Sequence, residues 1–131
     1  MKRFATISLA VMLCIGLIAG CSSVTVGSFS SKYLESDDHQ DAVNDVIGYF
    51  DSLKGCTLER IDYAGDSAVK AEADVRGIAP ERVIILEATF TTNSDSRDDG
   101  LESDHKYEHY RFVLVRETTG TPWEIVSHGI Q

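Results

Sequence analysis

The chain has 131 residues, of which 12 are basic and 21 acidic, giving a formal charge of -9, and 43% of the residues are hydrophobic. This length suits one domain with one core, because single domains commonly run about 100 to 150 residues, and it excludes a two-domain enzyme. The composition fits neither a wholly disordered chain nor a membrane protein with several spans. The negative charge opposes binding to phosphate backbones, so we expect no nucleic-acid partner.

The N-terminus has the features of an export signal. Lys2 and Arg3 are followed by an uncharged apolar run from residue 4 to residue 19. A membrane-spanning helix needs about 20 apolar residues, so the run is short for a span and typical of a signal peptide. We therefore predict that residues 1–20 are a signal peptide.

The end of this run carries a second signal. Residues 17–21 read LIAGC, which resembles the lipobox of bacterial lipoproteins, with Ile18 where leucine is commoner. The resemblance implies lipidation of the Cys21 thiol, cleavage before Cys21, and a chain anchored on the extracytoplasmic face of a bacterial cell membrane. Without residues 1–20 the chain keeps 10 basic and 21 acidic residues, a charge of -11. Acyl chains must then hold it at the membrane, since electrostatic attraction to anionic lipid is absent. The alternative is an ordinary cleaved secretory signal followed by an unrelated cysteine.

Cysteine use limits the redox chemistry. Cys14 belongs to the signal peptide and Cys21 to the lipid anchor, so Cys56 remains as a single thiol and no internal disulfide is expected. We expect Cys56 to be a small buried apolar residue. A nucleophilic role would need a neighbouring base, and no residue next to Cys56 in the sequence supplies one.

Residues 22–35 contain five serines and Gly27 among few large apolar residues. This composition is typical of a flexible linker, so residues 21–35 are predicted to be the lipidated cysteine and a tether. Residues 36–131 are predicted to form a single domain.

That domain should begin with a long amphipathic helix. Asp37 and Asp38 are suitable capping residues, and Lys54 followed by Gly55 predicts the end of the helix. Apolar residues recur behind the cap at helical spacing, namely Ala42, Val43, Val46, Ile47, Phe50 and Leu53. The helix therefore needs a sheet to cover its apolar face.

Four strands and a short helix are predicted to follow. Residues 56–63 have the composition of a strand, with a one-residue bulge near Glu59 or Arg60 that aligns its apolar side chains. Residues 67–76 form a short helix that Gly77 ends. The remaining strands are predicted at 83–92, 106–117 and 122–130. The predicted fold class is α+β, with one long helix on a curved four-stranded antiparallel sheet.

The turns predict the register of the last three strands. Leu114 should pair with Ile125, Phe112 with Ser127, Val113 with Val126, and Arg111 with His128. Between the two preceding strands, Ile84 should pair with Leu114, Leu86 with Phe112, Ala88 with Tyr110, and Glu87 with Arg111. The face with Leu86, Phe112 and Trp123 then meets the helix, while the face with Glu87, Arg111 and His128 meets water.

Four segments together resemble a known group of domains. The stretches GCTLERIDY, ERVIILEATF, YRFVLVR and TPWEIVSHGI, behind one amphipathic helix, are similar to small uncharacterised lipoprotein domains of Gram-positive bacteria. These domains belong to the cystatin-like, nuclear-transport-factor-like α+β roll. The resemblance covers about residues 40–131 and implies a curved sheet around a helix, with a small cavity and no known activity.

Enzymes on such rolls work inside the concave face of the sheet, where ionisable groups lose water and their pKa values shift. The predicted register places only Tyr110 and Ser127 there as polar residues. We therefore predict a non-catalytic binding or interaction module without a cofactor, whose partner is an envelope protein or a small ligand. A small hydrolase or isomerase that uses the cavity stays an alternative.

The open face carries the candidate interaction residues. Glu87, Arg111 and His128 form a predicted row, with His109 nearby, that suits an anion or carboxylate, although a solvated ion pair is the commoner role of such charges. An apolar strip of Ile85, Val113, Val115 and Val126 beside this row suits a partner or a second copy. The short helix at 67–76 would remove this surface if it covered the strip.

Two segments of the sequence carry residue types that bind metal ions. The acidic loop 93–105, with Asp98 and Asp99, suits calcium by its carboxylates, but Arg97 and Lys106 occupy ligand positions of the usual calcium loop. A calcium-dependent sensing or adhesion domain therefore stays a further alternative to a plain acidic loop. His105 and His109 would lie about 13 Å apart on a strand, so no zinc site is expected.

Overall fold

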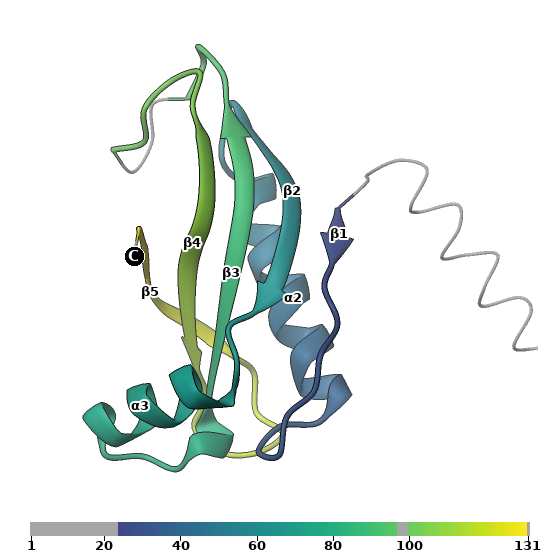
Figure 1. The fold of residues 1–131 in the computed structure, drawn as a ribbon, viewed down its shortest axis with the longest axis vertical. Helices are drawn as coiled ribbons and strands as arrows, with labels where there is room; N and C mark the ends of the chain where they lie inside the picture. Colours follow the sequence, from purple (N-terminus) through teal and green to yellow (C-terminus); the bar gives the residue numbers. More distant parts are fainter. Residues whose placement is uncertain (1–23, 97–99, 131) are drawn as a thin grey trace, which may run out of the picture.

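The computed structural model describes residues 24–96 and 100–130, which form an α+β fold with one five-stranded sheet of strand order β1-β2-β3-β4-β5 (Figure 1). β1 pairs in parallel with β2, and every other neighbouring pair is antiparallel. Helices α2 and α3 and a short 3-10 helix, η1, complete the described part of the chain. In chain order the elements are β1 (Thr25–Val26), α2 (Ser36–Asp51), β2 (Cys56–Tyr63), α3 (Asp66–Arg76), η1 (Pro80–Arg82), β3 (Val83–Thr92), β4 (Lys106–Val115) and β5 (Glu124–Gly129).

The α+β class is confirmed, but the prediction of four antiparallel strands is wrong. The fifth strand comes from the segment predicted to be a tether, where Thr25 and Val26 align with Arg60 and Ile61 of β2. The amide of Gly27 continues the pairing by donating to the carbonyl of Ile61 at 2.9 Å. We call residues 24–35 the strap, because they run along the domain beside α2 (Figure 1).

The serine-rich composition predicts a flexible tether for residues 24–35, whereas in the structure these residues pack against the domain. The few apolar residues of the strap are enough to fix it, since Leu34 is buried in the core while Val24 and Phe29 pack against it. The composition of a segment does not show whether a few apolar side chains are buried. Each large apolar side chain that is fully buried contributes about 1.5 to 3 kcal/mol to the stability of the fold.

Helix α2 begins at Ser36, with Glu35 as its N-cap residue. The carboxylate of Asp38 stabilises this end by accepting a hydrogen bond from the amide of Glu35 at 2.8 Å. Its apolar stripe is buried as predicted, with Ala42, Val43 and Val46 fully covered. The helix ends at Asp51, short of the predicted Lys54, and the chain turns through Gly55, whose φ is +78°. In neither α2 nor α3 does the described chain have the length and apolar character that crossing a bilayer requires.

The predicted inner face of the sheet is confirmed. A one-residue irregularity between Leu58 and Arg60 gives β2 the predicted bulge, and Glu87 pairs with Arg111 in β3 and β4. The side chains that meet α2 form one continuous core, whose buried sheet residues are Ile61, Ile84, Leu86, Ala88, Phe90, Tyr107, Tyr110, Phe112, Leu114 and Trp123.

The opposite face is not open along the predicted apolar strip. Helix α3 lies over it, and Val69 and Ala73 pack on Ile85 and Val113 in a second small core. The two helices therefore cover opposite faces of one sheet, α2 over most of its length and α3 at one end (Figure 1).

The register of β5 differs from the prediction after its first pair. Leu114 pairs with Ile125 as predicted, but Val113 pairs with Ser127 and Phe112 with His128. Val126 is thus an extra residue in β5, and this bulge turns every later side chain of the strand to the other face. The predicted pairs of Phe112 with Ser127, Val113 with Val126 and Arg111 with His128 are wrong for this reason.

Candidate functional site

An open cleft of about 400 Å³ lies between α2 and the hairpin that joins β4 to β5. The helix contributes acidic and amide side chains, because its polar face points away from the sheet. The end of β4 and the hairpin contribute an arginine and a tryptophan. The lining residues are Asp38, Asp41, Asn44, Asp45, Arg116, Gly120, Thr121, Pro122 and Trp123.

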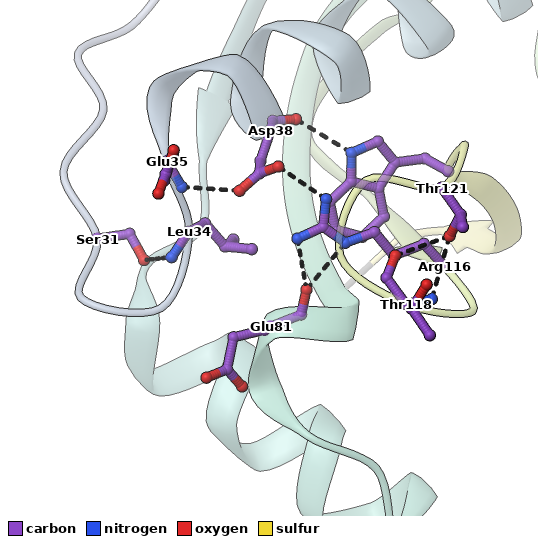
Figure 2. Close-up of polar contacts among 9 residues, drawn as sticks. Ser31, Leu34, Glu35, Asp38, Glu81, Arg116, Thr118 and Thr121 are labelled. Atoms are coloured by element: carbon purple, nitrogen blue, oxygen red, sulfur yellow. Dashed lines mark hydrogen bonds and ion pairs between the residues drawn. The ribbon is translucent and has the colours of Figure 1, made fainter.

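Arg116 forms the wall of this cleft and is itself buried, with 4% of its surface exposed. Its Nη1 donates to the Asp38 carboxylate at 2.7 Å, while its Nε and Nη2 both donate to the carbonyl of Glu81, at 3.0 and 2.8 Å. Figure 2 shows these bonds joining α2, β4 and the segment before β3. Each of the three guanidinium nitrogens of Arg116 therefore has a partner within the protein.

The ion pair determines the charge state of Asp38. Burial raises the pKa of this carboxyl, but the hydrogen bonds from Arg116 and from the Glu35 amide, with the positive charge of Arg116, outweigh burial and lower it. Asp38 is therefore an anion that is already neutralised inside the protein.

Trp123 holds the hairpin against α2. Its indole Nε1 donates to the carbonyl of Asp38 at 3.1 Å, and the guanidinium of Arg116 lies 4.3 Å from its ring centre. The hairpin itself is closed by the hydroxyl of Thr121, which donates to the carbonyl of Thr118 at 2.7 Å (Figure 2). Trp123 and Arg116 therefore fix the hairpin against α2 on one side of the cleft.

The rim on α2 is acidic, and its carboxylates have no counter-ion within the part of the chain that the structure describes. Asp41 and Asp45 are exposed residues one helical turn apart, where like charges repel. Partial loss of solvent around Asp45, together with the charge of Asp41, raises the pKa of the Asp45 carboxyl. Over residues 24–96 and 100–130, the ion pairs formed do not include either carboxylate. The same described residues contain no cluster of three or more side chains suited to holding a metal ion.

The predicted row on the outer face is found in part. Arg111 Nη2 lies 3.3 Å from the Glu87 carboxylate, and His109 Nδ1 lies 3.2 Å from the other oxygen of Glu87. A shallow cleft of about 260 Å³ adjoins Arg111, with Glu72 among its lining residues. Because Glu72 is paired with Arg76 and Glu87 with Arg111, this cleft carries little net charge.

His128 does not join that row, because the β5 bulge turns it to the face covered by α2. Its Nδ1 lies 2.9 Å from the Tyr110 hydroxyl, and its Nε2 lies 3.2 Å from the Tyr49 hydroxyl. The imidazole also stacks on Phe112 with ring centres 5.7 Å apart. His128 thus ties the end of α2 to the sheet.

The two predicted apolar contact residues are separated as well. Val113 lies under α3 with 5% of its surface exposed, whereas Val126 is 39% exposed at the bulge. The predicted partner strip of Ile85, Val113, Val115 and Val126 is therefore not a continuous surface.

Other predicted positions lie outside the described residues or away from the cleft. Cys21, the signal peptide, and Asp98 and Asp99 of the acidic loop are not among the described residues. Cys56 is half-buried, with its Sγ 3.9 Å from the Ser96 hydroxyl.

The residues that build the cleft were not singled out in the sequence as a site. Asp41 and Asp45 fall between the apolar positions of the predicted helix, on its solvent side, and Trp123 falls on the predicted core face of the sheet. Arg116 gave no signal, because its partners are 35 and 78 positions away. The one available signal was the spacing of Asp41 and Asp45, two acids a single turn apart.

A scan against models of protein families and searches of curated proteins and solved structures give no match to this chain. The function is therefore argued from the residues themselves.

Proposed function

We propose that the chain is a lipid-anchored, extracytoplasmic, non-catalytic binding domain, and that the cleft beside Trp123 takes the ammonium or guanidinium group of a cationic ligand. The observation that carries this proposal is the state of the charges in the cleft. Asp41 and Asp45 have no counter-ion among the described residues, while Arg116 in the same cleft is fully engaged with Asp38 and Glu81.

The energetics favour a cation at this place. Two unit charges 4 Å apart interact by about 1 kcal/mol in water and about 4 kcal/mol near a protein surface of lower effective dielectric constant. A bound cation also relieves the repulsion between Asp41 and Asp45 that contributes to the raised pKa of Asp45. The apolar part of the ligand can lie against the hairpin side of the cleft, where Pro122 is exposed.

Binding can be measured through the protein's own fluorescence, because Trp123 is the single tryptophan of the chain. We expect spermidine or a trilysine peptide to change the emission of Trp123 saturably at low salt, and we expect Asp41→Asn with Asp45→Asn to weaken binding at least tenfold. The charge-matched control is Asp37→Asn with Asp51→Asn, two exposed positions of the same helix outside the cleft, which should bind as the unmodified chain does.

The two probes separate the possible sources of the cation. Tighter binding of trilysine than of spermidine identifies a basic peptide segment, and the reverse identifies a small amine. Equal binding by the Asp41→Asn, Asp45→Asn variant and the unmodified chain would contradict the proposed site.

The anchoring part of the proposal rests on the LIAGC sequence at residues 17–21 and the apolar run before it. We expect bacteria that express the chain to incorporate labelled palmitate into it and to retain it in the membrane fraction. Cys21→Ser should abolish both, whereas Cys56→Ser should change neither. Palmitate labelling that survives in Cys21→Ser would show that the cysteine at the lipobox is not the modified residue.

The packing between α2 and the sheet supports a binding role in preference to catalysis. Aromatic rings fill this layer, with Phe50 against Phe90 at 4.7 Å and Tyr49 against Phe112 at 5.4 Å between ring centres. His128 lies at the edge of this aromatic layer, and both of its ring nitrogens already contact tyrosine hydroxyls.

A further inference from the structure

We propose that the strap, residues 24–35, is held by an acid-sensitive latch, and that protonation of His39 releases it from the domain. The latch is the contact between Phe29 of the strap and His39 of α2. Their rings stack with centres 4.3 Å apart and planes 12° apart, and Phe29 also meets the edge of Tyr63 at 4.9 Å.

His39 is buried without the partners that an imidazolium requires. Only 7% of its surface is exposed, and none of the described residues gives its Nε2 a hydrogen-bond partner. A neutral imidazole tolerates this apolar contact. A protonated imidazole would carry a positive charge away from water, and its Nε2–H would have no acceptor.

The charged groups around the ring do not compensate for protonation. Glu35 and Asp38 lie on the same helix, with Asp38 bound to Arg116, and Lys32 lies on the strap. On the elements beyond Phe29, Tyr63 and Asp66 are bound to each other at 2.6 Å. Burial alone lowers the pKa of His39, with no contribution from any of these groups.

The direction of the pH effect follows from this. The docked strap prefers neutral His39, and the ring recovers its ordinary pKa of about 6.5 once the strap leaves and water returns. Docking is therefore strongest above about pH 6.5 and weakens as the pH falls below it.

A second contact sets the end of the released segment. Ser31 Oγ and the amide of Lys32 donate to the Asp66 carboxylate at 2.6 and 2.9 Å. Burial raises the pKa of Asp66, but the hydrogen bonds from Ser31, Tyr63 and Lys32 outweigh it and keep the pKa below its usual value. Asp66 stays ionised at pH 5.5, so residues 24–30 are released before residues 31–35.

Release has a consequence that rests on the proposed anchoring, although the latch itself does not. The strap joins Cys21 to the domain, so undocking residues 24–30 would give the linker that begins at Cys21 a total root-mean-square reach of about 15 to 20 Å. The domain would then stand further from the membrane in acid.

The test is hydrogen exchange of the full-length chain in detergent at pH 7.5, 6.5 and 5.5, with exchange times corrected for the intrinsic effect of pH. We expect protection of peptides from the strap, which includes the Gly27 amide bound to Ile61, to fall at least tenfold between pH 7.5 and 5.5. Protection of β3 should stay constant over the same range.

His39→Phe keeps an aromatic ring on Phe29 and removes the titration, so its strap should stay protected at pH 5.5. His109→Asn is the matched control, since it removes an exposed histidine elsewhere and should respond to acid as the unmodified chain does. His39→Leu serves in the same role if His39→Phe does not fold. A strap whose protection is independent of pH in the unmodified chain, or an equal loss in His39→Phe and the unmodified chain, would overturn the proposal.

Discussion

Arg116→Met is expected to lower the free energy of unfolding by about 3 to 5 kcal/mol, the range for breaking a buried ion pair by removing one partner. The methionine keeps the volume of the aliphatic stem but leaves the Asp38 carboxylate without its counter-charge. It also removes both donors from the carbonyl of Glu81 and the cation from the ring of Trp123. The substitution would therefore remove the side chain that forms the wall of the cleft and would also destabilise the fold.

Urea denaturation of the variant beside the unmodified chain measures this loss. Arg60→Met is the control, because Arg60 forms a comparable 2.8 Å pair with Asp62 on the exposed surface, where water screens the charges, and it should destabilise the fold far less than Arg116→Met. Adding Asp38→Asn to Arg116→Met should recover part of the loss, since no buried charge is then unpaired. Equal effects of Arg116→Met and Arg60→Met would show that burial of the pair contributes nothing.

Gly55→Ala is expected to destabilise the fold by about 2 to 4 kcal/mol through strain and steric overlap. Gly55 has a φ of +78°, which an L side chain rarely adopts. A Cβ here would lie 2.6 Å from the backbone nitrogen of Ser96 and 2.9 Å from the carbonyl carbon of Asp95, and neither atom can move aside as a side chain would. The turn after α2 and the segment after β3 would therefore have to separate.

The matched control is Gly48→Ala, within α2. A Cβ at Gly48 meets no atom within 4 Å, and alanine is the better helix former, so this variant should gain about 0.5 to 1 kcal/mol. Thermal unfolding of both variants gives opposite shifts in melting temperature. A melting temperature of Gly55→Ala equal to that of the unmodified chain would contradict the role assigned to this turn.

Local pattern was enough to predict most of the inner core. The helical spacing of Ala42, Val43 and Val46 identified the buried stripe of α2, and the change of phase within residues 56–63 identified the bulge in β2. Both are periodicities of a single element, and burial of one face imposes them on the sequence directly.

Two features of the fold depended on tertiary contacts instead. The bulge at Val126 places His128 against Tyr49 and Tyr110. A strand register predicted by counting residues from the turn assumes regular pairing, so it could not predict this bulge. The strap is held by Phe29 and Leu34 within a polar segment that reads as a linker.

The cleft shows the same division between sequence and structure. The sequence by itself determined two helices, the strands from β2 to β5, the face that α2 covers and the acidic character of that helix's outer side. The tertiary structure decided that the guanidinium of Arg116 binds Asp38 and Glu81. It also decided that Asp41 and Asp45 line a cleft beside Trp123. The reason is physical: periodicity records which side of an element is buried, whereas the pairing of charges depends on distances between residues that are far apart in the chain.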